Sequence, residues 1–294
     1  MSKYEKKHTL KIKHKEALAG YAFSFPYLSG FLVLFVIPSL ISIYYCFTSG
    51  VGEIRFAGLE NFKSLVKSSS YILAVKNTLI FNTVSVPLII ILSFLTALLL
   101  NKALKGMRYF RMFFLMPLVI PIASVIMVWQ ITFSGSGVLN GVLSFFDIKT
   151  VDWMNTDWSM VVLIVLYVWK NCGYNIILFT AGLNSIPREY YESASIDGAG
   201  GFVRMRKITL PLIVPTLFFV FIVSIINSFK VFREAYMLGG DYPNLRIYML
   251  QHFMNNNFHN LNYQRLSTAS LLMGIFVVLL VYVLYRFEGR YNAL

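Results

Sequence analysis

The sequence predicts an all-α, polytopic membrane protein with six transmembrane helices and with both termini in the cytoplasm. Three observations predict this class: a composition too apolar for a water-covered surface, six long apolar runs, and an uneven distribution of Lys and Arg. Of the 294 residues, 57% are hydrophobic and 13% are charged, whereas soluble proteins carry roughly 25% charged residues. The mean hydropathy is +0.65. The two cysteines both lie in apolar runs, which excludes a disulfide scaffold and a cysteine-rich metal module.

Six stretches are long and apolar enough to cross a membrane, since a helix needs about 20 apolar residues to span ~30 Å of hydrocarbon. Together they fill about half of the chain, so no separate soluble domain is expected. The predicted organisation is a basic N-terminal segment at 1–20, a transmembrane domain at 21–287 and a tail at 288–294. The predicted spans are Tyr21–Phe47, Thr78–Leu100, Tyr109–Phe133, Trp158–Leu183, Ile208–Phe229 and Ser267–Phe287.

The loops between these spans differ in charge, and the side richer in Lys and Arg is expected to face the cytoplasm. One side carries 16 basic and six acidic residues, and the other carries nine basic and seven acidic residues. Of the net charge of +13, the first side therefore holds +10 and the second side +2. Lys170, which lies within a span, supplies the last unit. We interpret the basicity as anchoring to anionic lipid headgroups rather than as nucleic-acid binding. The 16 are Lys3, Lys6, Lys7, Lys11, Lys13, Lys15, Lys102, Lys105, Arg108, Arg111, Arg188, Arg204, Arg206, Lys207, Arg286 and Arg290.

The fourth span has a polar interruption, Trp169-Lys-Asn-Cys-Gly-Tyr-Asn175. A lysine at the centre of a transmembrane helix costs about 2.5–3.5 kcal/mol, so its presence needs a reason. Two interpretations stay open: a polar lining for a solute path, or a hydrogen-bond cluster between helices around a snorkelling lysine. Residues four apart share a helix face. The pairs that do so are Asn171 with Asn175, Lys170 with Tyr174 and, in the fifth span, Ser224 with Ser228.

Proline pairs occur in the third and fifth spans, at Pro117/Pro121 and Pro211/Pro215. Proline frees a backbone carbonyl and kinks a helix, which lipid tolerates only where neighbouring groups satisfy the backbone again. The pairs therefore favour bent helices around a pathway. In the last long loop, the pattern of Tyr248–Met254 predicts a short interfacial helix after a turn at 239–243.

A polar loop at 184–207 joins the fourth and fifth spans on the side predicted to be cytoplasmic. Pro187 suits the first turn of a helix, Asp197-Gly198 is expected to end that helix near Ile196, and a second helix is expected from Ala199 onward. Such a helix–turn–helix of small residues is either a docking element or an ordinary hairpin at the membrane surface.

The same loop carries a known pattern. Glu192-Ser-Ala-x-x-Asp197-Gly198-Ala, followed by Ile208-Thr-Leu-Pro-x-x-x-Pro215, resembles the EAA signature of ATP-binding-cassette importer permeases. The run Ala181–Pro187 is similar to the carbohydrate-uptake branch, which includes the larger permease subunit of maltose transporters. The resemblance extends along nearly the whole chain. It departs at Ser193, at Met205 and in the turn Gly239–Tyr242, which places an acid and an aromatic near the external mouth.

The resemblance implies the type I ABC importer permease fold and the import of a sugar or oligosaccharide by alternating access. It also implies a heterodimer with a second, homologous permease subunit, a cytoplasmic ATPase dimer that holds ATP and Mg, and an extracytoplasmic solute-binding protein. The implied ATPase coupling residues are Glu192, Ala194, Asp197, Gly198, Ala199, Leu210, Pro211 and Pro215. The candidate substrate pathway comprises Lys170, Asn171, Cys172, Gly173, Tyr174, Ser224, Asn227 and Ser228, with Gly173 and Ser228 preferred over Lys170.

The sequence also bears on three other classes of protein, a self-powered pump, a secondary transporter and a membrane enzyme. The chain has no Gly-x-x-x-x-Gly-Lys-[Ser/Thr] phosphate-binding loop, so no cofactor is expected in the chain itself and a self-powered pump is disfavoured. The alternative, a secondary transporter of a small polar solute, needs an intramembrane acid or ion site, and no Asp or Glu falls within a predicted span. The four histidines lie outside the spans without metal-ligand spacing, so neither a metal site nor an enzymatic centre is predicted. The sequence does not name the solute.

Overall fold

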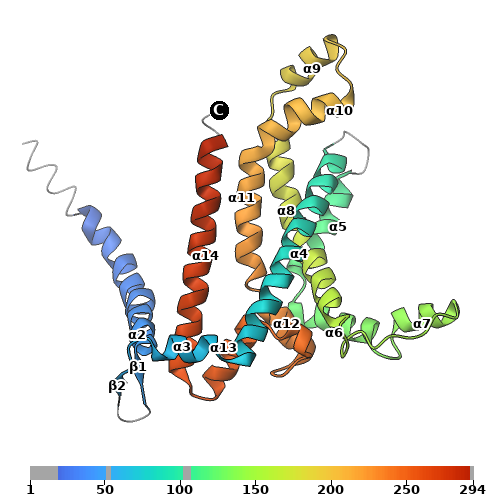
Figure 1. The fold of residues 1–294 in the computed structure, drawn as a ribbon. Coiled ribbons are helices and arrows are strands. Elements are labelled where there is room, and N and C mark those ends of the chain that lie inside the picture. The colour runs from blue at the N-terminus through green and yellow to red at the C-terminus, as the bar shows by residue number, and fades with distance from the viewer. Residues whose placement is uncertain (1–18, 51–53, 102–106, 292–294) are drawn as a thin grey trace, which may run out of the picture.

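The computed structural model describes residues 19–50, 54–101 and 107–291 as a set of long helices that run roughly side by side (Figure 1). Within these residues, six helices are long and apolar enough to cross a membrane, which confirms the predicted number of spans and the all-α class. They are Ala19–Cys46, Ser69–Leu100, Ile122–Phe145, Ser159–Asn184, Gly201–Gly239 and Tyr263–Phe287. Most of the predicted basic segment 1–20, Lys102, Lys105 and residues 292–294 lie outside the described residues, as do the side chains of Arg108, Arg111 and Arg290.

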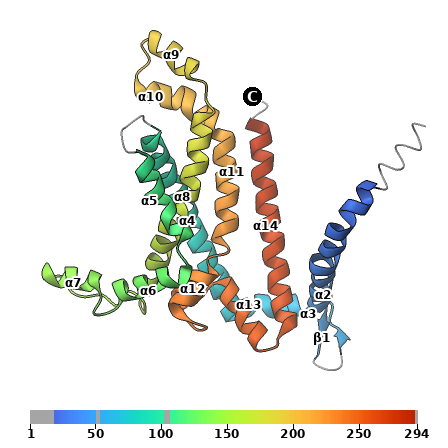
Figure 2. The same cartoon turned by 180° about the vertical axis from the view of Figure 1, so that it is seen from behind.

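The third span is not the single helix predicted at Tyr109–Phe133. It consists of α5 (Met107–Val119) and α6 (Ile122–Phe133), separated at Ile120-Pro121. Pro121 has an extended backbone with ψ 132°, and a residue before proline is pushed out of the helical region. After α6, α7 (Val138–Phe145) projects sideways from the bundle, whereas α5 runs beside α8 (Figures 1 and 2). The apolar segment Ile122–Phe145 therefore consists of two helices, α6 and α7, and its second helix points away from the other spans (Figures 1 and 2).

Two other prolines coincide with wider helical turns. Pro38 near the start of α2 (Ile37–Cys46) follows a π-helical segment at Leu32–Val36, and Pro211 near the start of α11 (Leu210–Ser228) follows another at Met205–Thr209. Proline clashes with the carbonyl four residues before it, and both of those carbonyls belong to the π segments. The Leu210 N–H bonds the Met205 carbonyl five residues back, so the backbone stays paired.

The core is built on α8 (Ser159–Asn184), which packs against α4 (Ser69–Leu100), α5 and α11. Phe81 on α4 meets Tyr167 on α8 edge to face at 5.3 Å between ring centroids, and Phe94 meets Phe179 at 5.4 Å. Such aromatic pairs add about 0.5–1.5 kcal/mol beyond burial. The α4 helix begins nine residues before the predicted Thr78, and the extra turns carry its contacts to the far end of the bundle.

The end of the bundle away from α9 (Arg188–Ile196) is covered by short elements. These are α3 (Glu60–Val66), α12 (Phe232–Gly239), a 3-10 turn at Leu245–Ile247, and α13 (Leu250–His259). The Asn77 side chain on α4 donates to the carbonyls of Leu245 (2.6 Å) and Tyr248 (3.0 Å), which fixes the chain before α13. The helix predicted near Tyr248–Met254 is present as α13, whereas α12 was not predicted.

A small hairpin was also not predicted. Strands β1 (Thr48–Ser49) and β2 (Arg55–Phe56) are antiparallel, with Thr48 opposite Phe56 and Ser49 opposite Arg55. The Asn61 side chain donates to the carbonyls of Cys46 (2.9 Å) and Thr48 (2.8 Å). Its amide therefore pairs backbone carbonyls that are left without a helical partner where the first span ends.

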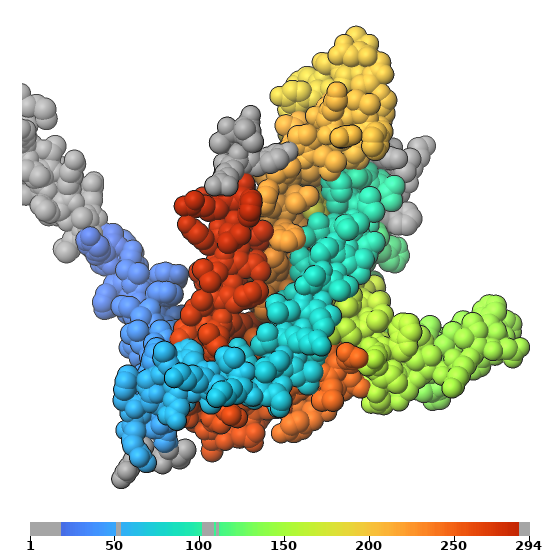
Figure 3. Space-filling model, viewed as in Figure 1, coloured from blue at the N-terminus to red at the C-terminus, as the bar shows by residue number. Residues whose placement is uncertain are grey.

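The first span stands apart from the bundle and meets α14 (Tyr263–Tyr291) near the β1–β2 end, as both views and the space-filling picture show (Figures 1–3). Its large apolar side chains are exposed along its length, including Phe23, Phe35 and Leu40. Exposed apolar faces of this length are the surfaces that lipid or a partner helix covers.

His252 on α13 is fully buried among aromatic rings, with Phe232 edge-on at 4.9 Å. Its Nδ1 accepts the Met249 N–H at 3.2 Å, so the neutral ring carries its proton on Nε2. Burial lowers the pKa of the imidazole to about 4, against a weaker opposing effect of the Asp241 carboxylate.

This burial predicts a loss of stability on acidification. The unfolded chain binds a proton at His252 near pH 6.5 and the folded chain only near pH 4, so the stability is complete above pH 6.5 and falls as pH drops through that interval. At about 1.4 kcal/mol per pKa unit, the loss is about 3 kcal/mol. Thermal unfolding in detergent at several pH values measures it. His252→Asn should flatten the pH dependence and exposed His259→Asn should not; equal slopes in both variants would contradict the assignment.

Candidate functional site

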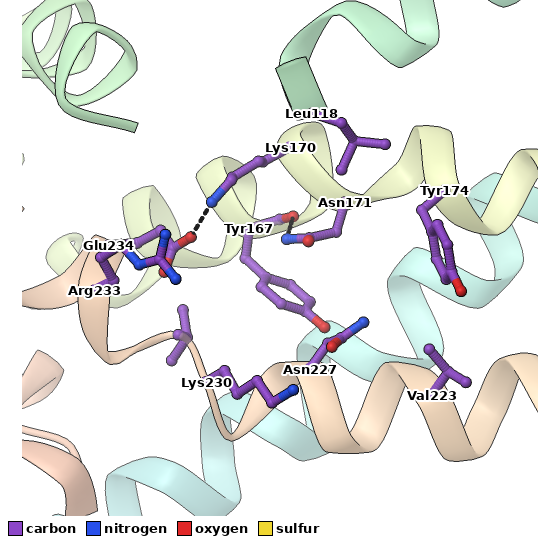
Figure 4. A pocket seen from close by; sticks show the side chains of 11 residues that line it. Leu118, Tyr167, Lys170, Asn171, Tyr174, Val223, Asn227, Lys230, Arg233 and Glu234 are labelled. Atoms are coloured by element: carbon purple, nitrogen blue, oxygen red, sulfur yellow. Dashed lines mark hydrogen bonds and ion pairs between the residues drawn. The ribbon is translucent and has the colours of Figure 1, made fainter. Parts of the chain in front are cut away.

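A cavity of about 370 Å³ opens between α5, α8, α11 and α12 (Figure 4). Its wall combines charged, amide and aromatic side chains, which is unusual for a site between apolar helices. The lining residues are Leu118, Tyr167, Lys170, Asn171, Tyr174, Val223, Asn227, Lys230, Val231, Arg233 and Glu234.

An ion pair lies at one end of this cavity. The Lys170 ammonium on α8 donates to Glu234 Oε1 on α12, and the side chains are 16% and 7% exposed. Lys170 therefore lines a polar cavity and also forms an ion pair between two helices, and this position does not choose between the two interpretations of the residue. Glu234 lies in the short helix α12, which follows the predicted fifth span. The charge of Lys170 in α8 is therefore neutralised by an acid from outside the predicted spans.

Four of the eight candidate pathway residues line the cavity: Lys170, Asn171, Tyr174 and Asn227. Asn171 donates to the Tyr167 carbonyl one turn earlier (2.9 Å) and is partly exposed. The predicted pairing of Asn171 with Asn175 on one polar face does not extend to the cavity, because Asn175 turns into the core.

The other four candidates, Cys172, Gly173, Ser224 and Ser228, lie in the helix packing instead of on this wall. The Ser224 hydroxyl accepts the Asn175 amide at 2.9 Å, and the Ser228 hydroxyl donates to its own helix at Ile225 (2.7 Å). The first of these contacts joins α8 to α11, the second lies within α11, and together they occupy both hydroxyls.

Cys172 contacts α4 and Gly173 contacts α5, the two other helices that pack on α8. The Cys172 Sγ lies 3.2 Å from the Ser93 hydroxyl on α4. A Cβ at Gly173 would overlap the Phe114 carbonyl of α5, so the absence of a side chain is what allows α5 to approach.

Sequence reasoning missed Glu234, Lys230, Arg233 and Tyr167 as members of this site. The signal that could have found Glu234 is the lysine itself, since a charge inside a span needs a partner and Glu234 follows the fifth span directly. The Tyr167 hydroxyl donates to the Ser224 carbonyl at 3.1 Å, which a sequence pattern does not reveal.

A second candidate site is the hairpin of α9 and α10 (Gly201–Arg204) at the opposite end of the bundle (Figure 3). Pro187 is the N-cap of α9 rather than part of its first turn. Gly198 has φ +75°, its N–H donates to Ser195, and the Ala199 N–H donates to the Ala194 carbonyl (2.8 Å). This is a Schellman ending, in which a left-handed glycine closes the helix.

Side chains hold the hairpin in one shape. The Tyr191 and Thr209 hydroxyls lie 2.9 Å apart, and Arg204 donates to the Ser195 hydroxyl at 2.8 Å. Ile196 at the tip is 87% exposed and Phe202 is 77% exposed. A fixed hairpin with apolar side chains in the open is the form of a docking element, and Glu192 and Asp197 are exposed on it as well.

Comparison with known proteins decides the family. Residues 78–292 match the family described as "Binding-protein-dependent transport system inner membrane component". The chain belongs to this family. It is therefore a multi-pass permease of the inner membrane, and a transport component rather than an enzyme.

Two relatives span nearly the same length. The chain is 34% identical over 283 residues to the probable ABC transporter permease protein YesP of Bacillus subtilis, across 92% of this chain and 91% of that protein. It is 32% identical over 290 residues to the trehalose/maltose transport system permease protein MalF of Thermococcus litoralis, across 97% and 98%. The second of these relatives is named for the transport of trehalose and maltose.

The fold has been solved in a related transporter. A chain of a bacterial ABC transporter involved in the import of the acidic polysaccharide alginate matches with a TM-score of 0.85 and 24% identity, across 96% of this chain and 99% of that one. This likeness confirms the type I ABC importer permease fold.

The buried ion pair predicts a non-additive mutant cycle. Glu234→Gln leaves the Lys170 ammonium buried without its counter-charge and should destabilise the permease by about 3 kcal/mol, whereas Lys170→Met/Glu234→Leu removes both charges and should cost less. Thermal unfolding in detergent measures both. The matched control is the exposed pair Arg246–Asp157, at 2.7 Å, where Asp157→Asn should leave the unfolding temperature nearly unchanged because solvent screens an exposed pair. Equal losses in Glu234→Gln and Asp157→Asn would contradict the prediction.

Proposed function

We propose that this permease translocates a sugar or oligosaccharide by alternating access, and that a separate ATPase drives it through the α9–α10 hairpin. The observation that carries the proposal is the continuity of the helix behind the hairpin. From Gly201, through the π segment at Met205–Thr209, to Ser228 the backbone is helical without a break. A force on the hairpin is thereby applied to the helix that presents Val223 and Asn227 to the cavity.

The hairpin residues that would meet the ATPase are those of the EAA signature. Glu192 and Asp197 are exposed, Ala194 and Ala199 allow a close approach, and Gly198 makes the turn. Leu210, Pro211 and Pro215 stand at the start of α11, where the hairpin joins the membrane helix.

We place the hairpin end in the cytoplasm. Arg188, Arg204, Arg206 and Lys207 lie there, and the positive-inside rule assigns such flanks to the cytoplasmic side. The described ends of the chain, near Ala19 and Tyr291, lie at the same end (Figure 1), so both termini are proposed to be cytoplasmic.

The remaining parts of the importer are separate proteins. ATP and Mg would be held by a cytoplasmic ATPase dimer, because the chain lacks a phosphate-binding loop. A second, homologous permease would form a heterodimer with this one, and an extracytoplasmic solute-binding protein, the general kind of partner that the family description names, would deliver the solute. The solute class follows the relative named for trehalose and maltose.

The turn at Gly198 is the first test. Gly198→Val places a β-branched residue at φ +75°, which costs about 1–3 kcal/mol of backbone strain, so the turn should open and solute uptake should fall about 10-fold or more. The matched control is Gly200→Val, because Gly200 has φ −65° and open space around it. Uptake by the assembled importer is measured in cells. Equal uptake by both variants would show that the shape of the turn does not matter for coupling.

The energy source is the second test. Uptake into vesicles that contain the assembled importer should require internal ATP, because the chain lacks a phosphate-binding loop of its own and depends on the ATPase. It should also require the external binding protein, as expected for binding-protein-dependent transport. Sustained uptake with an ion gradient alone would favour the secondary transporter.

A further inference from the structure

The charges of the cavity are not balanced. Three of its side chains are cationic, Lys170, Lys230 and Arg233, and one is acidic, Glu234. Lys170 and Glu234 neutralise each other. Among the residues that the structure describes, neither Lys230 nor Arg233 forms a salt bridge. The cavity therefore holds an excess of two positive charges on exposed side chains.

The helix dipole favours a positive charge at Lys230 but not at Arg233. Lys230 follows the C-terminus of α11, where the helix dipole favours a cation. Arg233 lies in the first turn of α12, beside Glu234, where the dipole disfavours a cation and favours an acid. The helix end therefore does not favour this arginine, which is exposed on the cavity wall.

The polar groups are sorted along the cavity (Figure 4). The side chains of Lys170, Arg233 and Glu234 gather toward one end, Lys230 extends toward Asn227 in the middle, Asn171 also lies between the ends, and Tyr174 lies toward the other end with Val223. Amides bind hydroxyl groups, and a tyrosine ring offers an apolar face with a polar tip. A volume of about 370 Å³ falls within the usual range of about 300–1,000 Å³ for a small-molecule site.

We propose that the solute is a saccharide or polyol that carries a negative charge, as a carboxylate or a phosphate ester, and that Lys230 and Arg233 bind this group during passage. The guanidinium fork of Arg233 matches either anion in a bidentate way. Glu234 keeps Lys170 in place and limits the positive charge of the site, so that an anion is attracted without being held too tightly to leave. This inference rests on the proposed function and narrows its solute class.

The complete importer, expressed in a host without its own carbohydrate uptake, tests the proposal with three radiolabelled probes: trigalacturonate, glycerol 3-phosphate and maltotriose. We expect import of one of the two anionic probes, and which of them enters distinguishes a carboxylate from a phosphate ester. Lys230→Gln/Arg233→Gln should lower uptake of that probe at least 10-fold through a higher KM. Lys230→Arg should stay within about threefold. Lys63→Gln, an exposed lysine of α3 outside the cavity, should match the wild type.

Stimulation of ATP hydrolysis by the binding protein is measured in parallel. Its absence in the wild-type importer would count against the proposed function itself. If stimulation is present, import of maltotriose alone, or of none of the probes, would overturn the charge assignment. Anionic uptake that is unchanged in the double variant would also overturn it, and would assign the two cations to lipid headgroups.

Discussion

A single buried charge organises the cavity between α5, α8, α11 and α12. Lys170 stands in the middle of α8, where an unpaired ammonium would be costly, and the pair with Glu234 makes the position tenable. Because Glu234 is carried by α12, the chain after α11 has to turn back onto α8. That return closes one side of the cavity and brings Arg233 and Lys230 to its wall. The electrostatics of the site therefore follow from the need to neutralise one lysine.

Packing around α8 separates the structural polar groups from those exposed to the cavity. Asn175, Ser224, Cys172 and Ser93 satisfy one another within the helix contacts, as buried polar groups must. The groups left over, on the remaining face of α8 and the end of α11, are Lys170, Asn171, Tyr174 and Asn227. The helix face on which a polar residue lies thus decides its place, since Asn175 joins two helices whereas Asn171 and Asn227, with the same side chain, line the cavity.

The long spans could be predicted from sequence because each depends on one local property, a run of about 20 apolar residues. The turn at Gly198 could be predicted for a similar reason, since a glycine after a short helix is a local signal. The cavity could not be predicted from such local signals. Glu234 lies beyond the predicted end of the fifth span, in α12, which is too short to show a clear periodic pattern. Likewise, Gly173 has no side chain to show that the Phe114 carbonyl lies against it. Both depend on which helices become neighbours, and that information is spread over the whole chain.

The π segment before Pro211 has a consequence for the direction in which the hairpin points. A π turn holds one residue more than an α turn, and one residue of an α-helix subtends about 100°. The extra residue within Met205–Thr209 therefore sets the angle between the exposed tip at Ile196 and the face of α11 that carries Asn227. A relative that lacked this residue, with Pro211 replaced to restore regular α geometry, would present its hairpin about a quarter of a turn away from the same cavity. The length of this segment thus acts as the angular register between the two ends of the permease.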